Sequence, residues 1–94
     1  MTIRAFQDLI RQRYYATDSA RGTPGTFLWF AEEVGELASA LGEAERGKLD
    51  RDNLCEEFAD VLAWLCTLAN INDVDLAEVV SKYTVGPGPE GTKT

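Results

Sequence analysis

Apolar side chains recur at spacings of three and four residues along most of the chain, which is the period of an amphipathic helix. We expect helices over residues 3–16, 26–46 and 51–70, followed by a short fourth helix that ends near residue 83. No segment shows the strict alternation of apolar and polar residues that marks a half-buried strand. The pattern predicts an all-α fold, in which the second and third helices form an antiparallel hairpin accompanied by an N-terminal helix and a short C-terminal helix.

The second and third helices carry the strongest apolar stripes. The stripe of the second helix consists of Phe27, Phe30, Val34, Leu37 and Leu41. The stripe of the third helix consists of Leu54, Phe58, Val61, Leu65 and Leu68, and Leu62 and Ala69 widen it. Because a helix so broadly apolar is buried on more than one side, we expect a homodimer whose helices complete a four-helix-bundle core, with a dimer of dimers as the alternative.

Glycine, proline and capping residues separate these helices. Residues 17–26 (TDSARGTPGT) are rich in glycine and proline and predict a loop, with Thr23 or Thr26 capping the helix that follows. Gly47 is expected to end the second helix at the C′ position.

Aspartates are available to start the later helices. Asp50 or Asp52 is the expected cap of the third helix, and Asp73 or Asp75 that of the fourth. Residues 1–83 should form one domain, and the glycine- and proline-rich residues 84–94 a flexible tail.

The charge balance limits the partners. Sixteen acidic residues against nine basic ones give a net charge of −7, so the chain lacks the basic surface that binds a nucleic-acid polymer. No apolar segment is long enough to span a membrane, and the first residues lack the apolar run of a signal peptide. Cys55 and Cys66 lie roughly 16 Å apart along one helix and cannot pair with each other, which favours a reducing compartment, the cytoplasm.

The chain contains no histidine. This absence excludes a serine–histidine pair, a histidine-ligated zinc ion and the Glu-x-x-His type of di-iron bundle.

Carboxylates flank the apolar stripes of both hairpin helices. Glu33 and Glu36 share one face of the second helix, and Glu57 and Asp60 share one face of the third, because residues three apart lie about 60° apart around the axis. In an antiparallel hairpin these four acids converge, and they repel one another unless a cation lies among them. An all-oxygen ligand set favours Mg²⁺, with Mn²⁺ as a substitute. The alternative is that they are ordinary solvated acids on helix surfaces.

These acids stand in a recognisable context. The segment EEVGE (32–36) followed by EFAD (57–60) resembles the E-E-x-x-E … E-x-x-D signature of the MazG-like group of all-α nucleoside triphosphate pyrophosphohydrolases, and the resemblance extends over roughly residues 3–83. It implies Mg²⁺-dependent hydrolysis of a nucleoside triphosphate, standard or modified, to the monophosphate and pyrophosphate. This activity would clear unwanted nucleotides from the pool.

The resemblance also implies roles for individual residues. Those that match the metal-binding acids, also assigned as catalytic, are Glu33, Glu36, Glu57 and Asp60. Glu32 matches the first acid of the motif, which orients a ligand or assists the attacking water. Lys82 and Tyr83 resemble a Lys-Tyr pair near the end of small family members, where the cation would meet a phosphate, and Lys48 is a weaker candidate of the same kind.

Aromatic residues adjoin the acids. Trp29 lies four residues before Glu33, and Trp64 lies four residues after Asp60, so each can either stack on a nucleobase or pack against a neighbouring helix or subunit. Phe6 and Tyr14 on the first helix are expected in the core.

Three alternatives stay open. Phosphoribosyl-ATP pyrophosphohydrolase belongs to the same superfamily but tends to carry histidine after a "DLLYH"-like segment, where this chain has DVLAWL. A non-catalytic helical module could bind a nucleotide or a protein with the same fold. A purely structural bundle would tolerate Glu57→Gln without functional loss.

Overall fold

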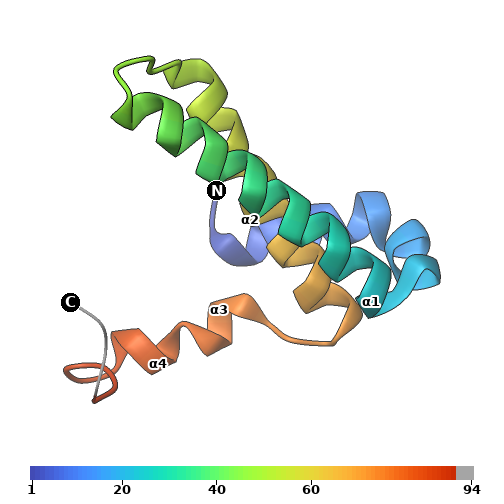
Figure 1. Cartoon of the computed structure of the whole chain (residues 1–94). Helices are drawn as coiled ribbons and strands as arrows, with labels where there is room; N and C mark the ends of the chain where they lie inside the picture. Colours follow the sequence, from blue (N-terminus) through green and yellow to red (C-terminus); the bar gives the residue numbers. More distant parts are fainter. Residues whose placement is uncertain (91–94) are drawn as a thin grey trace.

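A computed structural model describes residues 1–90 of the chain. In this range the chain forms helices and no strand: α1 (Ile3–Glu45), α2 (Arg51–Ile71), α3 (Leu76–Val79) and α4 (Ser81–Thr84). The C-terminal part of α1 and α2 form the antiparallel hairpin, and α3 and α4 follow as two short helices (Figure 1). The predicted all-α class is confirmed, whereas part of the predicted tail, residues 91–94, lies outside the described residues.

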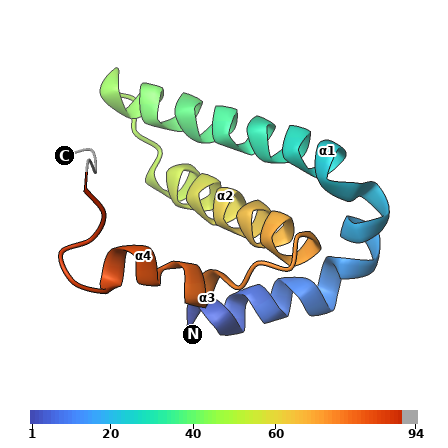
Figure 2. The ribbon, with the colours of Figure 1, turned by 90° about the horizontal axis from the view of Figure 1, so that it is seen from below.

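The loop predicted over residues 17–26 is wrong, because α1 continues through it and bends at one residue. Gly22 has φ 79° and ψ 175°, a conformation that glycine adopts easily because it has no Cβ. Pro24 follows, near the start of the next helical turn, where a missing N–H costs little. The bend divides α1 into an N-terminal arm (residues 3–21) and a C-terminal arm (residues 23–45), which lie on opposite sides of α2 (Figure 2).

The turn of the hairpin forms as the sequence predicts. Gly47 has φ 80°, and the Lys48 N–H donates to the Glu43 carbonyl at 2.8 Å, the bond that closes a helix end around a C′ glycine. Asp50 then caps α2, its side chain accepting from the Asn53 N–H at 3.1 Å. These local bonds set the direction in which α2 returns along α1.

A buried pair of amides joins α1, α2 and the chain leading to α3. The Gln7 amide nitrogen donates to Asn70 Oδ1 at 3.0 Å and to the Val74 carbonyl at 2.7 Å. Gln7 Oε1 accepts from the Leu76 N–H at 2.9 Å, and Asn70 Nδ2 donates to the Gln7 carbonyl at 3.3 Å. All the side-chain polar atoms of both amides are therefore paired.

The start of α3 is held at the same place. Asp75, one of the two predicted caps, accepts from the Ala77 N–H at 2.9 Å and forms an ion pair with Arg4 at 3.1 Å. The single short helix predicted to end near residue 83 is present as two helices, α3 and α4.

The core of one chain is small. Among the described residues, the buried apolar ones are Ile10, Ala40, Cys66 and Ala69. Phe27 and Phe58, from the two predicted apolar stripes, remain 55% and 54% exposed, and Tyr14, expected in the core, is 49% exposed. Much of the apolar surface of the hairpin is thus uncovered in the single chain. Among the described residues, no helix combines the length and the hydrophobicity that a bilayer span requires.

Candidate metal centre

Three carboxylates converge between the C-terminal arm of α1 and α2. Glu33 and Glu36, one turn apart on α1, face Glu57 on α2, and one carboxylate oxygen from each lies within 4.8 Å of the other two. The i, i+3 spacing places both α1 acids on one side of that helix. The hairpin supplies the third acid from the opposite side.

Burial and like charges both act on this cluster. Partial burial is the main factor that raises the pKa of Glu33 and of Glu57, followed by the negative charges of Glu36 and Asp60. A carboxylate that loses water and gains anionic neighbours favours its protonated form. The cluster therefore resists ionisation unless positive charge is supplied.

The cluster also leaves hydrogen-bonding capacity unused. Glu33 Oε2 and Glu57 Oε2 are sealed from solvent, and within the described part of the chain neither has a hydrogen-bond partner. A buried polar atom without a partner is costly and calls for an explanation. Carboxylate oxygens are ligands that fit Mg²⁺ or Mn²⁺, and Glu33, Glu36 and Glu57 are the residues that would hold such a cation.

The remaining predicted acids lie near the cluster to different degrees. Asp60 is close enough for its charge to raise the pKa of Glu33 and Glu57, although it is not among the three acids whose oxygens converge. Glu32 is exposed and is not part of that group. Its predicted role in orienting a ligand or a water stays a prediction.

The two tryptophans form a pair. The Trp29 and Trp64 rings are stacked, with centroids 6.3 Å apart and planes inclined by 19°. Because Trp29 precedes Glu33 by one turn and Trp64 follows Asp60 by one turn, the pair lies one turn along the hairpin from the acids, toward the bend of α1.

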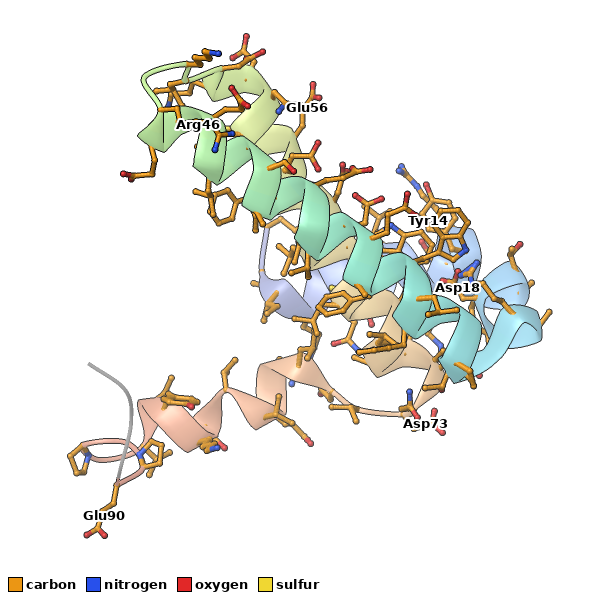
Figure 3. The ribbon with its side chains drawn as sticks, in the orientation of Figure 1. Tyr14, Asp18, Arg46, Glu56, Asp73 and Glu90 are labelled. Atoms are coloured by element: carbon orange, nitrogen blue, oxygen red, sulfur yellow. The ribbon has the colours of Figure 1, made fainter. Side chains whose placement is uncertain are left out.

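A second polar group lies at that bend, beyond the tryptophans. A cavity of about 370 Å³ opens between the N-terminal arm of α1 and α2, and its polar and aromatic lining includes Tyr14, Thr17, Asp18, Arg21, Trp64 and Thr67. Figure 3 shows Tyr14 and Asp18 together at this end of the hairpin, with Arg46 and Glu56 at the other end. Asp18 is only 5% exposed and forms an ion pair with Arg21.

Asp18 and Arg21 were not predicted as site residues. Both fall in the segment interpreted as a loop, where an acid and an arginine are expected to be solvated. The available signal was their i, i+3 spacing, which pairs opposite charges only if the segment is helical.

The predicted phosphate contacts do not join the acids within one chain. Lys82 and Tyr83 are exposed on α4, which extends away from the hairpin (Figure 1), and the Lys82 ammonium lies 5.5 Å from the Tyr83 ring centroid. Lys48 is exposed at the turn between α1 and α2. Their roles in binding phosphate stay predictions.

Fold and site together define an all-α protein whose helical hairpin carries a cluster of carboxylates. The MazG nucleotide pyrophosphohydrolase domain family matches residues 23–85, and the chain therefore belongs to this family. A phosphoribosyl-ATP pyrophosphatase of Cereibacter sphaeroides is 45% identical over 62 residues, which are 65% of this chain and 58% of that protein. The chain thus spans less than two thirds of that relative's length. No solved structure matches the chain significantly.

Proposed function

We propose that the chain hydrolyses nucleoside triphosphates, standard or modified, to nucleoside monophosphate and pyrophosphate, and so removes unwanted nucleotides from the pool. The observation that carries this proposal is the convergence of carboxylate oxygens of Glu33, Glu36 and Glu57 within 4.8 Å of one another. Two buried oxygens of this cluster have no hydrogen-bond partner among the residues that the structure describes. Membership of the MazG family supports the same chemistry.

Mg²⁺ is the proposed cofactor, with Mn²⁺ as a substitute. Glu33, Glu36 and Glu57 would hold it, and Asp60 would complete the negative environment. When bound, the ion would neutralise the charge of the triphosphate and favour nucleophilic attack on phosphorus. The acids themselves would fix the position of the phosphates, and one of them would accept the proton of the attacking water.

A homodimer is the proposed assembly. Phe58 and Leu62 on α2 and Phe27 on α1 are between 41% and 55% exposed, and a second copy of the hairpin would cover them in a four-helix core. Phe58→Lys should therefore give monomers by light scattering, whereas Asp52→Lys, an exposed change on the same helix, should leave the dimer intact. A monomeric wild-type protein would contradict this assembly.

The proposed compartment is the cytoplasm. Both cysteines are free thiols, and burial raises the pKa of the Cys66 thiol, which keeps it unreactive. Two unpaired cysteines in a small domain fit a reducing environment.

Phosphoribosyl-ATP is the second candidate substrate. The relative that bears the name phosphoribosyl-ATP pyrophosphatase favours it, whereas the absence of histidine after DVLAWL disfavours it. Both substrates would be cleaved at an anhydride between phosphates, so the acid cluster alone does not separate them.

The test is pyrophosphate release from a panel of standard and modified nucleoside triphosphates and from phosphoribosyl-ATP, with and without Mg²⁺. Glu36→Gln and Glu57→Gln should lower turnover roughly 10²–10⁴-fold, while Glu45→Gln, a change of an exposed acid on the same helix as Glu36, should leave turnover unchanged. Nucleotide binding without turnover would instead indicate a non-catalytic module. Absence of both turnover and nucleotide binding would indicate that the acids are ordinary solvated residues on the helix surfaces.

A further inference from the structure

The cavity at the bend of α1 contains a buried charge whose pairing is incomplete. Asp18 Oδ1 accepts from Arg21, but Asp18 Oδ2 is sealed from solvent and has no hydrogen-bond partner in the described part of the chain. The side chain of Asp18 is 7% exposed and lines the cavity. A carboxylate oxygen buried without a donor is destabilising, so the geometry points to a donor that arrives with a ligand.

Arg21 holds Asp18 in place and closes one side of the cavity. Its Nε donates to Thr26 Oγ1 at 3.1 Å, and its guanidinium lies 5.0 Å from the Trp64 ring centroid. With one bond to each of Asp18 and Thr26 and a contact with an aromatic face, the guanidinium is fixed on three sides. Oδ2 of Asp18 is therefore a fixed acceptor rather than one that can turn toward water.

The cavity lies in line with the acid cluster along the hairpin. Trp64 follows Asp60 by about 6 Å of helix and Thr67 follows it by about 10 Å, and both line the cavity. This inference rests on the proposed function: a nucleotide whose phosphates lie at the acids would extend along the hairpin past the tryptophan pair. Its base would then enter the cavity with the edge farthest from the sugar directed at Asp18.

That edge differs between bases. In pyrimidines the group at C4 lies opposite the bond to the sugar, and it is an amino donor in cytosine but a carbonyl acceptor in uracil and thymine. In purines the corresponding group at C6 is an amino donor in adenine and a carbonyl in guanine and hypoxanthine. A carboxylate can only accept a hydrogen bond, so a carbonyl at this position would leave Asp18 Oδ2 unpaired beside a second acceptor.

We propose that Asp18 is a specificity-determining residue that selects nucleotides whose base carries an amino group at this distal position, namely cytosine and adenine nucleotides. In this proposal the acid cluster is required for hydrolysis, and Asp18 determines which bases bind. A hydrogen bond to a charged group changes affinity by about 10- to 100-fold, so the preference for CMP over UMP, and for AMP over IMP, should be of that order.

The experiment measures binding separately from hydrolysis. The affinities of CMP, UMP, AMP and IMP for the wild-type protein are measured by calorimetry in EDTA, and the fluorescence of the only two tryptophans, Trp29 and Trp64, reports whether the cavity is occupied. Asp18→Asn should reduce the CMP-to-UMP preference to less than about threefold or reverse it, because an amide can also donate to a carbonyl. Asp8→Asn, an exposed change on the same arm that does not line this cavity, should preserve the preference.

The outcomes separate this inference from the proposed function. Preferential binding of CMP and AMP, lost in Asp18→Asn, supports the inference even if no triphosphate is hydrolysed. Equal binding of all four nucleotides by the wild-type protein overturns it, even if hydrolysis is efficient. If circular dichroism shows that Asp18→Asn does not fold, the wild-type comparison of CMP with UMP and of AMP with IMP decides alone.

Discussion

Two groups of polar side chains lie along the same pair of helices, and their pairing differs. At the junction of α1, α2 and α3, every side-chain polar atom of Gln7 and Asn70 has a partner within 3.3 Å. At the acid cluster, Glu33 and Glu57 each have a buried oxygen that has no hydrogen-bond partner among residues 1–90. The amide network is buried and complete, whereas the acid cluster is partly exposed and, among residues 1–90, incompletely paired.

On the function proposed above, this difference in pairing distinguishes a network that holds the helices together from a cluster that binds a ligand. A satisfied polar network fixes how helices dock, because any other arrangement would leave its members unpaired. A polar network with unpaired members lowers the stability of the chain and calls for an explanation, such as a ligand that supplies the missing partners. Asp18, with one paired and one unpaired oxygen, belongs with the acid cluster in this respect.

The largest expected effect on stability is at the complete network. Asn70→Leu should lower the free energy of unfolding by about 1–3 kcal/mol. The change removes the acceptor of one Gln7 side-chain hydrogen bond and the donor to the Gln7 backbone carbonyl. Urea unfolding of the metal-free protein measures this loss. Asn53→Leu, an exposed change on the same helix, should stay within about 0.5 kcal/mol of the wild type. Equal stability of Asn70→Leu and wild type would show that the network does not hold the junction.

Glu57→Gln should change the stability of the metal-free protein in the opposite direction from Asn70→Leu, and by a smaller amount. Removing one negative charge relieves the repulsion among Glu33, Glu36 and Glu57, so the metal-free variant should melt at a slightly higher temperature than the wild type. Thermal unfolding in EDTA measures the shift, with Glu45→Gln as the control outside the cluster. A lower melting temperature for Glu57→Gln alone would mean that the carboxylate is paired in a way that stabilises the chain.

The stability of the metal-free protein should depend on pH because of burial and the same repulsion among the acids. The pKa of Glu33 and of Glu57 is raised above the ordinary value of 4.5, chiefly by burial and then by neighbouring charge. The folded state therefore holds more protons than the unfolded state once the pH exceeds about 4.5, and stability falls as the pH rises through the raised values.

The difference between the wild type and a Glu33→Gln/Glu57→Gln variant isolates this effect, because contributions from the other acids cancel. In EDTA, the variant's advantage should be small near pH 4.5 and should grow toward neutral pH. An advantage that does not change with pH would contradict the raised pKa values.

Features of the fold that depend on residues close together in the sequence were predicted, whereas features that depend on distant residues were missed. The turn at Gly47 and the cap at Asp50 were predicted because a few neighbouring residues determine them. The convergence of three predicted acids follows from helical spacing, which places Glu33 beside Glu36, and from the antiparallel hairpin, which brings Glu57 opposite. Their roles in binding metal stay predictions.

Long-range contacts explain what was missed. Residues 17–26 contain typical loop residues, yet one glycine conformation at Gly22 provides the whole bend, and tertiary packing on α2 keeps the rest helical. Tyr14 lines a cavity instead of the core, and Asp18 is buried. Both facts depend on how the N-terminal arm folds back against α2, which local spacing does not encode.

The most direct test of the central claim is Mn²⁺ binding to the metal-free protein, followed by electron paramagnetic resonance, with Mg²⁺ as the competitor. The wild type and Glu45→Gln should bind at least one Mn²⁺ per chain that Mg²⁺ displaces. Glu57→Gln should bind it at least about 10-fold more weakly, because one of three converging ligands is lost. Equal Mn²⁺ binding by Glu57→Gln and the wild type would contradict the claim that the acid cluster binds a divalent cation, since the Glu57 carboxylate would then not be a ligand.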